Sequence, residues 1–342
     1  MTAPARLLLD ADALVANWRA LARLGGGAAC GAAVKADGYG LGAREVVARL
    51  AGAGCRDVFV ATWVEAAAIA DLGVPVSVLH GVRADDMGVA LAMSGTRPVL
   101  NTPEQVRRWR QAGGGACDVM VDTGMNRLGV AAEDIAAGLL DGLAVETLMS
   151  HLACADEPSD MNPIQRDRLA ALAGRTPARR LSLANSAGIA LGRDYAFDLT
   201  RPGLALYGGV PSPGLAGLVR PVATIEAEVL QRRRVLAGEA VGYNATWTAP
   251  ADTWVGIVNL GYADGYWRGF SSRGCAFAGD APLPVIGRVS MDLVALDLGI
   301  TDVAEGDRVR FDPDLTRASA MSGMSQYELL TGLGQRFERV WG

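Results

Sequence analysis

The sequence predicts an α/β protein in which an N-terminal (β/α)8 TIM-like barrel precedes a C-terminal, mainly-β domain. Short apolar runs alternate with Ala-rich helical segments from about residue 28 to residue 210. After about residue 220 the helical periodicity ends, and short β-rich runs separated by Gly and Asp turns replace it. The length of 342 residues also fits two domains. We therefore expect a barrel over residues 10–220 and a β-rich domain over residues 221–342.

Eight apolar runs in the first part are predicted to be parallel strands: Ala28–Val34, Val58–Ala61, Val76–Leu79, Pro98–Leu100, Cys117–Val121, Val145–Ser150, Leu181–Ala184 and a last one near Leu204–Tyr207. Helical patterns lie between them at Ala43–Leu50, Val64–Leu72, Pro103–Ala112 and Ile164–Leu172. The third helix has a clear start, because Asn101-Thr102 offers a cap before Pro103. Eight such strand-helix units favour a closed barrel over an open sheet.

The second part carries β-rich runs at Thr224–Leu230, Trp254–Asn259, Pro284–Ile286, Leu293–Leu298 and Asp307–Phe311. Only the tail, Ser325–Leu333, has a helical pattern again. One more strand-like run, Arg6–Leu9, precedes the barrel and can pair with the β-rich domain. We therefore group strand 1–9 with that domain.

Composition and charge exclude several classes of function. The net charge of −5 and the isoelectric point near 5.2 disfavour nucleic-acid binding, which needs a clustered basic face. The five cysteines are scattered without a CxxC pair, so we expect no metal site and no disulfide framework. No apolar stretch is long enough to cross a bilayer, and the run Leu7–Leu9 ends at Asp10, too soon for a secretory signal. We expect a cytoplasmic protein that binds neither nucleic acid nor membranes.

Lys35 follows the first predicted strand and is the only lysine of the chain. Functional groups of such a barrel lie at the carboxyl ends of its strands, so Lys35 is expected at the barrel mouth. Burial there lowers the pKa of a lysine and favours the neutral amine that Schiff-base chemistry needs. The alternative is a surface lysine at a strand end. The neighbouring glycines and Tyr39, and the lack of any other lysine, weigh against that alternative.

Polar groups also lie at the ends of later predicted strands, at Asp122–Gly129, Ser150-His151 and Asn185-Ser186, and Arg201–Leu204 then precedes Tyr207. Ser186 and the backbone N–H of Gly203 are suited to hold a phosphate, which barrels often bind after their seventh and eighth strands. Each group alone is a weak signal. An amine, phosphate-holding groups, arginines and a histidine on one face together indicate pyridoxal phosphate (PLP) as a cofactor.

The segment Val34–Gly40 resembles the PLP-binding signature of alanine racemases. The resemblance continues, in the family's order, at Asp122–Gly129, Ser150–Ala153, Ala184–Gly188, Arg201–Gly208, Val241–Ala249, Leu260–Gly265, Gly287–Asp292 and Tyr327–Leu330. It implies a PLP-dependent isomerase that interconverts L-alanine and D-alanine. The later segments reach into the β-rich domain, which barrel-only PLP proteins of this superfamily lack.

The resemblance assigns two catalytic bases. Lys35 would carry PLP and act on the D side of the substrate, and Tyr243 would act on the L side. In the family this tyrosine enters the active site from the other subunit, which implies an obligate homodimer with shared active sites. Racemisation needs a proton acceptor on each face of the planar carbon, and a desolvated lysine and a tyrosine beside an arginine can both serve.

The resemblance also implies the binding residues. Arg201 would donate to the pyridine nitrogen, with His151 close by. The phosphate would be held by Tyr39, Ser186, Gly203, Leu204 and Tyr327. Arg127 would contact the phenolic oxygen of PLP and the substrate carboxylate. The partner subunit's Met291 and, less directly, the partner subunit's Asp292 would shape the substrate pocket, with Tyr262 lining its entrance.

One position departs from the family pattern. Many alanine racemases have a lysine, modified by carbon dioxide to a carbamate, seven residues before the arginine that corresponds to Arg127. This chain has Met120 there, and methionine forms no carbamate. We expect another group or a bound anion to replace the carbamate, or none at all, and we expect no effect of carbon dioxide on activity.

Several alternatives stay open on the sequence. A broad-specificity amino-acid racemase would share the mechanism but have a larger pocket. A fold-related PLP decarboxylase generally pairs an acidic residue with the pyridine nitrogen, unlike Arg201. A PLP-carrier protein resembles only the barrel. Within the racemase reading, the product could supply D-alanine for the cell wall, or the enzyme could act in D-alanine breakdown.

Overall fold

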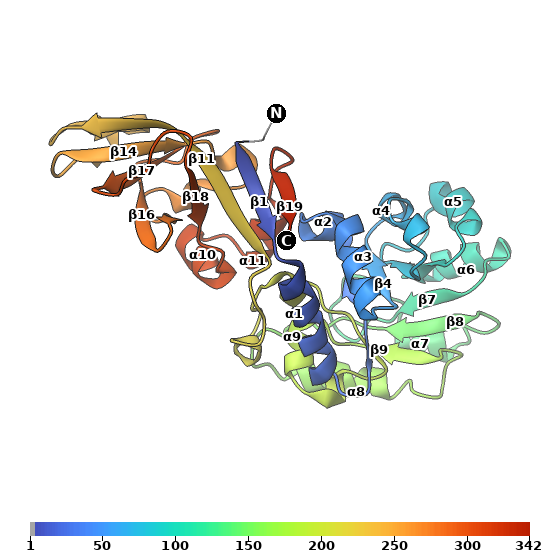
Figure 1. Cartoon of the computed structure of the whole chain (residues 1–342). Coiled ribbons are helices and arrows are strands. Elements are labelled where there is room, and N and C mark those ends of the chain that lie inside the picture. Colours follow the sequence, from blue (N-terminus) through green and yellow to red (C-terminus); the bar gives the residue numbers. More distant parts are fainter. Residues whose placement is uncertain (1–3) are drawn as a thin grey trace. The chain divides into compact units, whose positions relative to one another are not determined.

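The computed structural model describes residues 4–342, which form two compact units (Figure 1). The barrel unit comprises Leu14–Leu206 and Val210–Val219. The β unit comprises residues 4–13, Tyr207–Gly209 and Arg220–Gly342. The strand predicted over residues 1–9 includes residues 1–3, which lie outside the described part. Within residues 4–342, no helix has both the length and the apolar character needed to cross a membrane.

The barrel unit is built on parallel strands that neighbour one another in chain order. Seven of them form one sheet: β3 (Ala32–Ala33), β4 (Val58–Val60), β5 (Val76–Val78), β6 (Thr96–Leu100), β7 (Cys117–Met120), β8 (Val145–Met149) and β9 (Arg180–Ser182). An eighth strand, β10 (Leu199–Thr200), pairs in parallel with β2 (Ala29–Cys30), just before β3. Two hydrogen bonds of 2.8 Å continue the ladder on either side, from Arg201 N to Ala184 O and from Ala33 N to Pro202 O. The predicted eight-stranded barrel is confirmed.

The position of the eighth strand differs from the prediction. Leu204–Tyr207, predicted as the last strand, is the 3-10 helix η4, and the strand is β10, which ends before Arg201. Leu204 and Tyr207 are both buried. A short apolar run predicts burial, but it does not distinguish a buried strand from a buried helical turn.

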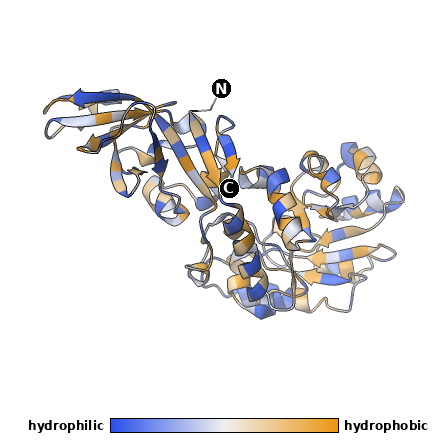
Figure 2. Ribbon diagram, in the orientation of Figure 1, coloured by the Kyte–Doolittle hydropathy of each residue, from blue (hydrophilic) through white to orange (hydrophobic). Residues whose placement is uncertain are grey.

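The helices of the barrel unit alternate with its strands: α1 (Ala11–Leu24, which begins in the β unit), α3 (Ala43–Ala53), α4 (Trp63–Ala67), α5 (Met87–Ala92), α6 (Pro103–Gln111), α7 (Ala132–Ala136), α8 (Met161–Ala170) and α9 (Ser186–Ala190). Helix α6 begins where the sequence predicts. The Thr102 side chain caps it by accepting a hydrogen bond from Gln105 N, and Pro103 occupies the first helical position, where the N–H that proline lacks would have no partner in the helix. Helices α1 and α3 carry both hydrophilic and hydrophobic residues (Figure 2). Strands β4, β5 and β7 are buried along their whole length, as in a parallel sheet covered by helices.

The β unit holds an eight-stranded sheet in the order β14–β17–β16–β15–β18–β11–β1–β19, in which β11 also pairs with β14. Its strands are β1 (Ala5–Leu9), β11 (Ala223–Val235), β14 (Thr253–Val258), β15 (Cys275–Ala278), β16 (Ala281–Ile286), β17 (Val294–Gly299), β18 (Arg308–Phe311) and β19 (Glu338–Trp341). A separate hairpin pairs β12 (Ala240–Val241) with β13 (Trp247–Thr248). Strand β1 runs antiparallel to β11, with Leu7 opposite Ile225. The mainly-β character predicted for this part is confirmed.

Two helices accompany this sheet, α10 (Leu315–Ser322) and α11 (Gln326–Thr331). The sequence predicts α11 but misses α10, and it also misses β15 and β19. Of the residues in α10, Ala318 is the one that is buried, so the segment lacks the apolar periodicity that predicts a helix. Its start is fixed instead by Asp314, whose side chain accepts hydrogen bonds from Thr316 N and Arg317 N.

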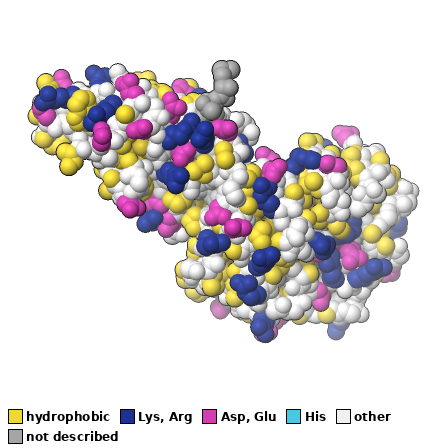
Figure 3. All heavy atoms as spheres, in the orientation of Figure 1, with side chains coloured by type: hydrophobic (Ala, Val, Ile, Leu, Met, Phe, Trp, Pro, Cys, Tyr) yellow, Lys and Arg dark blue, Asp and Glu magenta, His cyan; other side chains and the backbone are white. Residues whose placement is uncertain are grey.

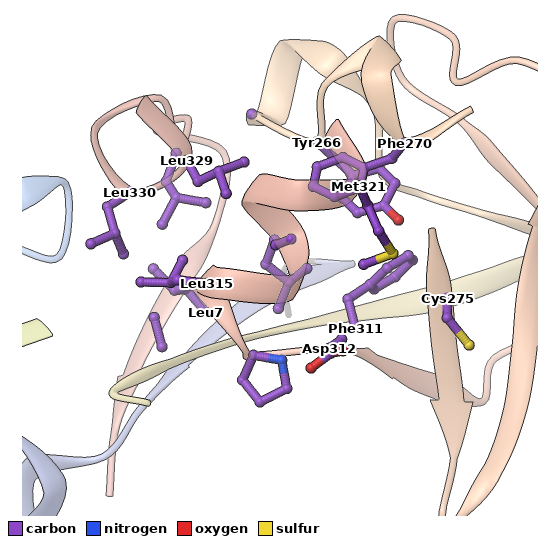
Figure 4. A pocket seen from close by; sticks show the side chains of 16 residues that line it. Leu7, Tyr266, Phe270, Cys275, Phe311, Asp312, Leu315, Met321, Leu329 and Leu330 are labelled. Atoms are coloured by element: carbon purple, nitrogen blue, oxygen red, sulfur yellow. The ribbon is translucent and has the colours of Figure 1, made fainter. Parts of the chain in front are cut away.

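An apolar cavity of about 70 Å³ lies between the sheet and these two helices (Figure 4). Leucines gather at one end of it in the close-up, and Tyr266, Phe270 and Phe311 at the other. The residues that line it include none of those predicted for the active site. The chemistry predicted from the sequence therefore lies elsewhere in the fold.

Candidate active site

Lys35 stands at the carboxyl end of the first barrel strand, where the backbone takes an unusual course. The next five residues all have positive φ, between 52° and 85°. The segment α2 (Lys35–Tyr39) is therefore largely a left-handed turn, closed by a 2.9 Å hydrogen bond from Gly40 N to Ala36 O. Each non-glycine residue in this conformation costs roughly 1–2 kcal/mol. Backbone strain of this kind concentrates at functional sites.

The surroundings of Lys35 favour its neutral amine. Burial lowers the pKa of Lys35 from its ordinary value, and the positive charge of Arg127 lowers it further. Glu65 opposes this effect, and Arg201 adds to it. A neutral amine is the form that acts as a nucleophile or as a base.

Arg201 follows β10, and its side chain is buried in the barrel. The guanidinium donates to Ser150 O at 2.6 Å and to Leu183 O at 3.5 Å, and it also donates to Ser182 Oγ. Burial lowers the pKa of Arg201 to about 10, and the charge of Asp118 partly offsets this. Arg201 therefore stays charged at neutral pH while its hydrogen-bond acceptors are neutral.

His151 follows β8 and belongs to the same cluster. Burial lowers the pKa of its imidazole to about 3, and the charges of Arg201, Arg127 and Lys35 are further causes. The ring is therefore neutral at physiological pH. Because charge effects decay within several ångströms, these mutual shifts indicate that the four side chains share one region of the barrel.

Ser186 and Gly203, both predicted to hold a phosphate, are hydrogen-bonded to each other. Ser186 Oγ accepts hydrogen bonds from the N–H of Gly203 at 2.9 Å and of Ala205 at 3.1 Å, which leaves its hydroxyl proton available to donate. A Cβ on residue 203 would overlap the Tyr39 side chain, which lies against this glycine. Leu204 is buried in the same turn. The N–H of Gly203, predicted to bind a phosphate, therefore already has an acceptor, and the Ser186 hydroxyl is the group of this pair that can donate to a phosphate oxygen.

Arg127 is exposed in the turn after β7. In the described chain, residues 4–342, it makes no hydrogen bond or ion pair with another residue. Its turn is fixed by Asp122, whose carboxylate accepts from Gly124 N at 2.8 Å and Met125 N at 2.9 Å. Met120, in the position of the modified lysine of the family, is only 7% exposed. The guanidinium of Arg127 is thus available to an anionic group of a ligand.

The β unit carries the other predicted residues, and three of them are exposed: Tyr243 at 69%, Met291 at 55% and Tyr327 at 45%. Tyr243 opens a short turn between β12 and β13. The N–H of Ala263 donates to Met291 O at 3.0 Å, so the turn Tyr262–Asp264 lies against the loop of Met291. Exposed aromatic and apolar side chains are common at contact surfaces.

Asp292 is part of an ion-pair network that the sequence does not reveal. Arg336 donates to Asp292 at 2.7 Å and to buried Asp264 at 2.7 and 2.9 Å. Asp264 also accepts a 2.9 Å hydrogen bond from Gly261 N. The partners are far apart in sequence, so no local motif could have identified Arg336. The network fixes the two loops that carry Tyr262 and Met291.

Sequence reasoning also misses Glu65. Its carboxylate accepts a 2.6 Å hydrogen bond from the N–H of Ala36, directly after Lys35. The spacing of Thr62 and Glu65 marks a capping box, which could have identified the helix start. Nothing local indicates that the same carboxylate reaches the Lys35 turn.

The predicted residues thus fall into two sets, one in each unit. The barrel unit holds Lys35, Tyr39, Arg127, His151, Ser186, Arg201, Gly203 and Leu204, and the β unit holds Tyr243, Tyr262, Met291, Asp292 and Tyr327. Of the first set, the Lys35 amine, whose pKa is lowered, and two arginines lie together, and the turn that carries the Ser186 hydroxyl lies near Tyr39. Such a site can bind an anionic molecule and move a proton. No group of acidic, His or Cys side chains among residues 4–342 is arranged to hold a metal ion.

Family models match both parts of the chain. The alanine racemase N-terminal domain matches residues 9–211, and the alanine racemase C-terminal domain matches residues 222–341. The chain is 42% identical to an alanine racemase of Acidiphilium cryptum, covering 98% of each chain. It is 39% identical to a catabolic alanine racemase of Agrobacterium fabrum, covering 99% of this chain and 92% of the relative.

Solved structures of alanine racemases are also similar to this chain. The alanine racemase of Bartonella henselae, solved with covalently bound pyridoxal phosphate, has a TM-score of 0.90 at 31% identity, covering 99% of this chain and 100% of that one. The biosynthetic alanine racemase of Pseudomonas aeruginosa has a TM-score of 0.90 at 30% identity, with both chains fully covered.

Proposed function

The chain belongs to the alanine racemase family, and on that premise we propose how its own residues interconvert L-alanine and D-alanine with PLP. The barrel over residues 10–220 binds the cofactor, and the β-rich domain, which comprises residues 221–342 and strand β1 (Ala5–Leu9), supplies the second base. PLP, when bound, delocalises the negative charge left on the α-carbon after the proton leaves.

The residues present fit this cofactor. A phosphate and a carboxylate both carry negative charge, and the barrel cluster offers the cations Arg127 and Arg201. The Ser186 hydroxyl can donate to a phosphate oxygen, because its oxygen accepts from Gly203 N and Ala205 N, and the absence of a side chain at Gly203 lets the Tyr39 hydroxyl come close to this turn. Leu204 is buried in the same turn, and we propose Tyr327 as a further phosphate-binding residue on the strength of the family resemblance.

Lys35 binds the cofactor through its amine and then serves as the base on the D side of the substrate. Burial and the charge of Arg127 lower the pKa of this amine, which favours the neutral form that can accept the α-proton. Arg201 would donate to the pyridine nitrogen of the bound cofactor, and neutral His151 belongs to the same cluster. A guanidinium gives up its proton with difficulty, so Arg201 offers a hydrogen bond without protonating that nitrogen.

Tyr243 serves as the base on the L side, and it reaches the site from the partner subunit. Its 69% exposure suits a side chain that a second copy of the chain covers. The partner subunit's Met291 and the partner subunit's Asp292 border the substrate, with Tyr262 at the entrance, and Arg127 binds the substrate carboxylate. We therefore propose a homodimer with shared active sites.

The observation that carries the proposal is the single lysine of the chain at the carboxyl end of the first barrel strand, with its pKa lowered by burial and by the charges of Arg127 and Arg201. Circular dichroism of L-alanine incubated with the enzyme and PLP tests the activity, and the signal should decay to zero. Borohydride reduction should attach PLP to Lys35 alone. Lys35→Ala should abolish both the racemisation and the attachment of PLP. Full activity in that variant would refute the role proposed for Lys35.

Mixing inactive variants tests the shared site. A heterodimer of Lys35→Ala and Tyr243→Phe subunits contains one site with an intact lysine and an intact tyrosine. We expect the mixture to regain activity that neither variant has alone. If each site were built from one subunit, mixing would restore nothing.

We propose a cytoplasmic enzyme that makes D-alanine for the cell wall or breaks it down, since the relatives include a catabolic and a biosynthetic racemase. On the face shown in Figure 3, basic and acidic side chains are interspersed, unlike the single-sign surface that nucleic-acid binding uses.

Racemisation rates on alanine, serine and lysine distinguish an alanine racemase from a broad-specificity amino-acid racemase.

A further inference from the structure

The Lys35 turn is held by a carboxylate from the neighbouring strand-helix unit. Glu65 lies in the first turn of α4, and its Oε1 accepts a 2.6 Å hydrogen bond from the N–H of Ala36. Its Oε2 accepts from the N–H groups of Ala61 at 2.7 Å and Thr62 at 3.0 Å. One carboxylate therefore ties the turn after β3 to the end of β4.

Glu65 is itself held in place. Its backbone N–H donates to Thr62 Oγ1 at 3.3 Å, which completes a capping box at the start of α4. The carboxylate engages three backbone donors, and charge-assisted hydrogen bonds of this kind are short and strong. The contact with Ala36 is thus a rigid connection between the scaffold and the turn.

The turn needs such support because its backbone is strained. Ala36, Asp37 and Tyr39 are not glycines, yet their φ angles are 54°, 52° and 55°. The Asp37 side chain fixes the far end of the turn by accepting from Ala43 N at 2.8 Å. Without the Glu65 contact, the near end would relax toward ordinary φ and carry the Lys35 amine with it.

The charges around Lys35 make Glu65 distinctive. The charges of Arg127, Glu65 and Arg201 act on the pKa of Lys35, and Lys35 in turn lowers the pKa of His151. The two arginines and burial lower the pKa of Lys35, whereas Glu65 raises it. Glu65 therefore acts on the amine through its charge as well as through the backbone.

We propose that Glu65 is a positioning residue for Lys35: its carboxylate fixes the left-handed turn against the end of β4 and thereby the place of the amine. The inference rests on the proposed role of Lys35 as the cofactor-binding amine. It gives Glu65 control over how fast, and at which pH, that amine reacts.

Two variants of Glu65 distinguish the effect of its charge from the effect of its side-chain length. Glu65→Gln keeps the size of the side chain and removes its charge, whereas Glu65→Asp keeps the charge and is one methylene shorter. Glu45→Gln is the matched control, because Glu45 is an exposed carboxylate on the adjacent helix α3 that pairs with Arg49 at the surface. The Asp variant keeps the test decisive if the Gln variant does not fold.

The chain's single lysine makes the first readout specific. Pulse acetylation of the full chain before PLP is added, followed by mass spectrometry, reports the reactivity of Lys35 at each pH. We expect Glu65→Gln to lower the pKa of Lys35, because a neighbouring negative charge is lost. Glu65→Asp should shift the profile less, and Glu45→Gln should leave it unchanged.

The second readout is the rate at which added PLP is trapped on Lys35 by borohydride. Both Glu65 variants should trap it roughly ten-fold more slowly or worse, since a misplacement of about 1 Å can cost a hundred-fold in rate. Glu45→Gln should match the wild type.

A wild-type trapping rate in either folded Glu65 variant would overturn the proposal, even if its melting temperature had fallen, because a purely structural role moves stability and not the amine. Lys35→Ala separates this outcome from failure of the proposed function. If that variant still trapped PLP at the wild-type yield, Lys35 would not be the cofactor-binding amine and both proposals would fail.

Discussion

Gly203 and Tyr39 approach each other so closely that a Cβ on residue 203 would lie 2.2 Å from the Tyr39 hydroxyl oxygen. They come from opposite ends of the barrel sequence, the turn after β10 and the turn after β3. Their contact joins the eighth strand to the first at the end of the barrel where the candidate site lies.

Gly203→Ala should therefore weaken PLP binding, because the methyl group displaces Tyr39 from the proposed phosphate cradle. Overpacking of this kind costs about 1–3 kcal/mol, and each 1.4 kcal/mol lowers affinity about tenfold. Fluorescence titration with PLP measures the change. Gly88→Ala in α5 is the control, since a Cβ there meets nothing within 4 Å, and its affinity should stay at the wild-type value. Equal affinities in the two variants would contradict the proposed cradle.

Tyr243→Phe should affect the two enantiomers unequally. The phenol is the proposed base for L-alanine, so exchange of its α-proton should fall by about 10²–10⁴-fold, while Lys35 still exchanges the α-proton of D-alanine. Deuterium uptake from heavy water, followed by NMR, measures each enantiomer separately. Tyr195→Phe in the barrel unit serves as the control. An equal loss for both enantiomers would argue against a two-base arrangement.

Carbon dioxide should have no effect on activity. Met120 occupies the position where many relatives carry a carbamate, and a thioether cannot form one. Racemisation rates in degassed and in bicarbonate-containing buffer at one pH should agree. A bicarbonate-dependent rise, or a carbamate found by mass spectrometry or in a crystal structure, would show that another group takes this role.

His151 should make the cofactor-free protein less stable as the pH falls. Burial and nearby cations lower the pKa of His151 to about 3 in the folded chain, from an ordinary value of about 6.5. Between these values the unfolded chain binds a proton that the folded chain does not. Lowering the pH through this window therefore favours unfolding, by at most about 1.4 kcal/mol per pH unit.

Urea unfolding at several pH values between 7 and 4.5 tests this dependence. His151→Gln should show a flatter curve than the wild type, because the titrating group is gone. His80→Gln, which removes the exposed second histidine, should keep the wild-type slope. A His151→Gln curve as steep as the wild type would mean that other groups carry the pH dependence.

The sequence by itself determined the two-part architecture, the barrel's strand count and the place of Lys35 at a strand end. These features follow from local patterns: apolar periodicity, caps and the change of texture near residue 220. The role assigned to Tyr243 depended on resemblance, because its segment carries no chemical signal of its own. The sequence misplaced the eighth strand, because the run at Leu204–Tyr207 is apolar in either conformation.

Only the tertiary structure decided which groups surround the lysine. Glu65 reaches Ala36 across 29 residues, and Arg336 reaches Asp264 across 72. The sequence also gives no sign of the left-handed backbone after Lys35, because Ala36 and Asp37, which precede the first glycine of the segment, rarely adopt that conformation. Local patterns report which residues are buried, whereas hydrogen bonds and charge effects depend on distances between segments that only the folding of each unit brings together.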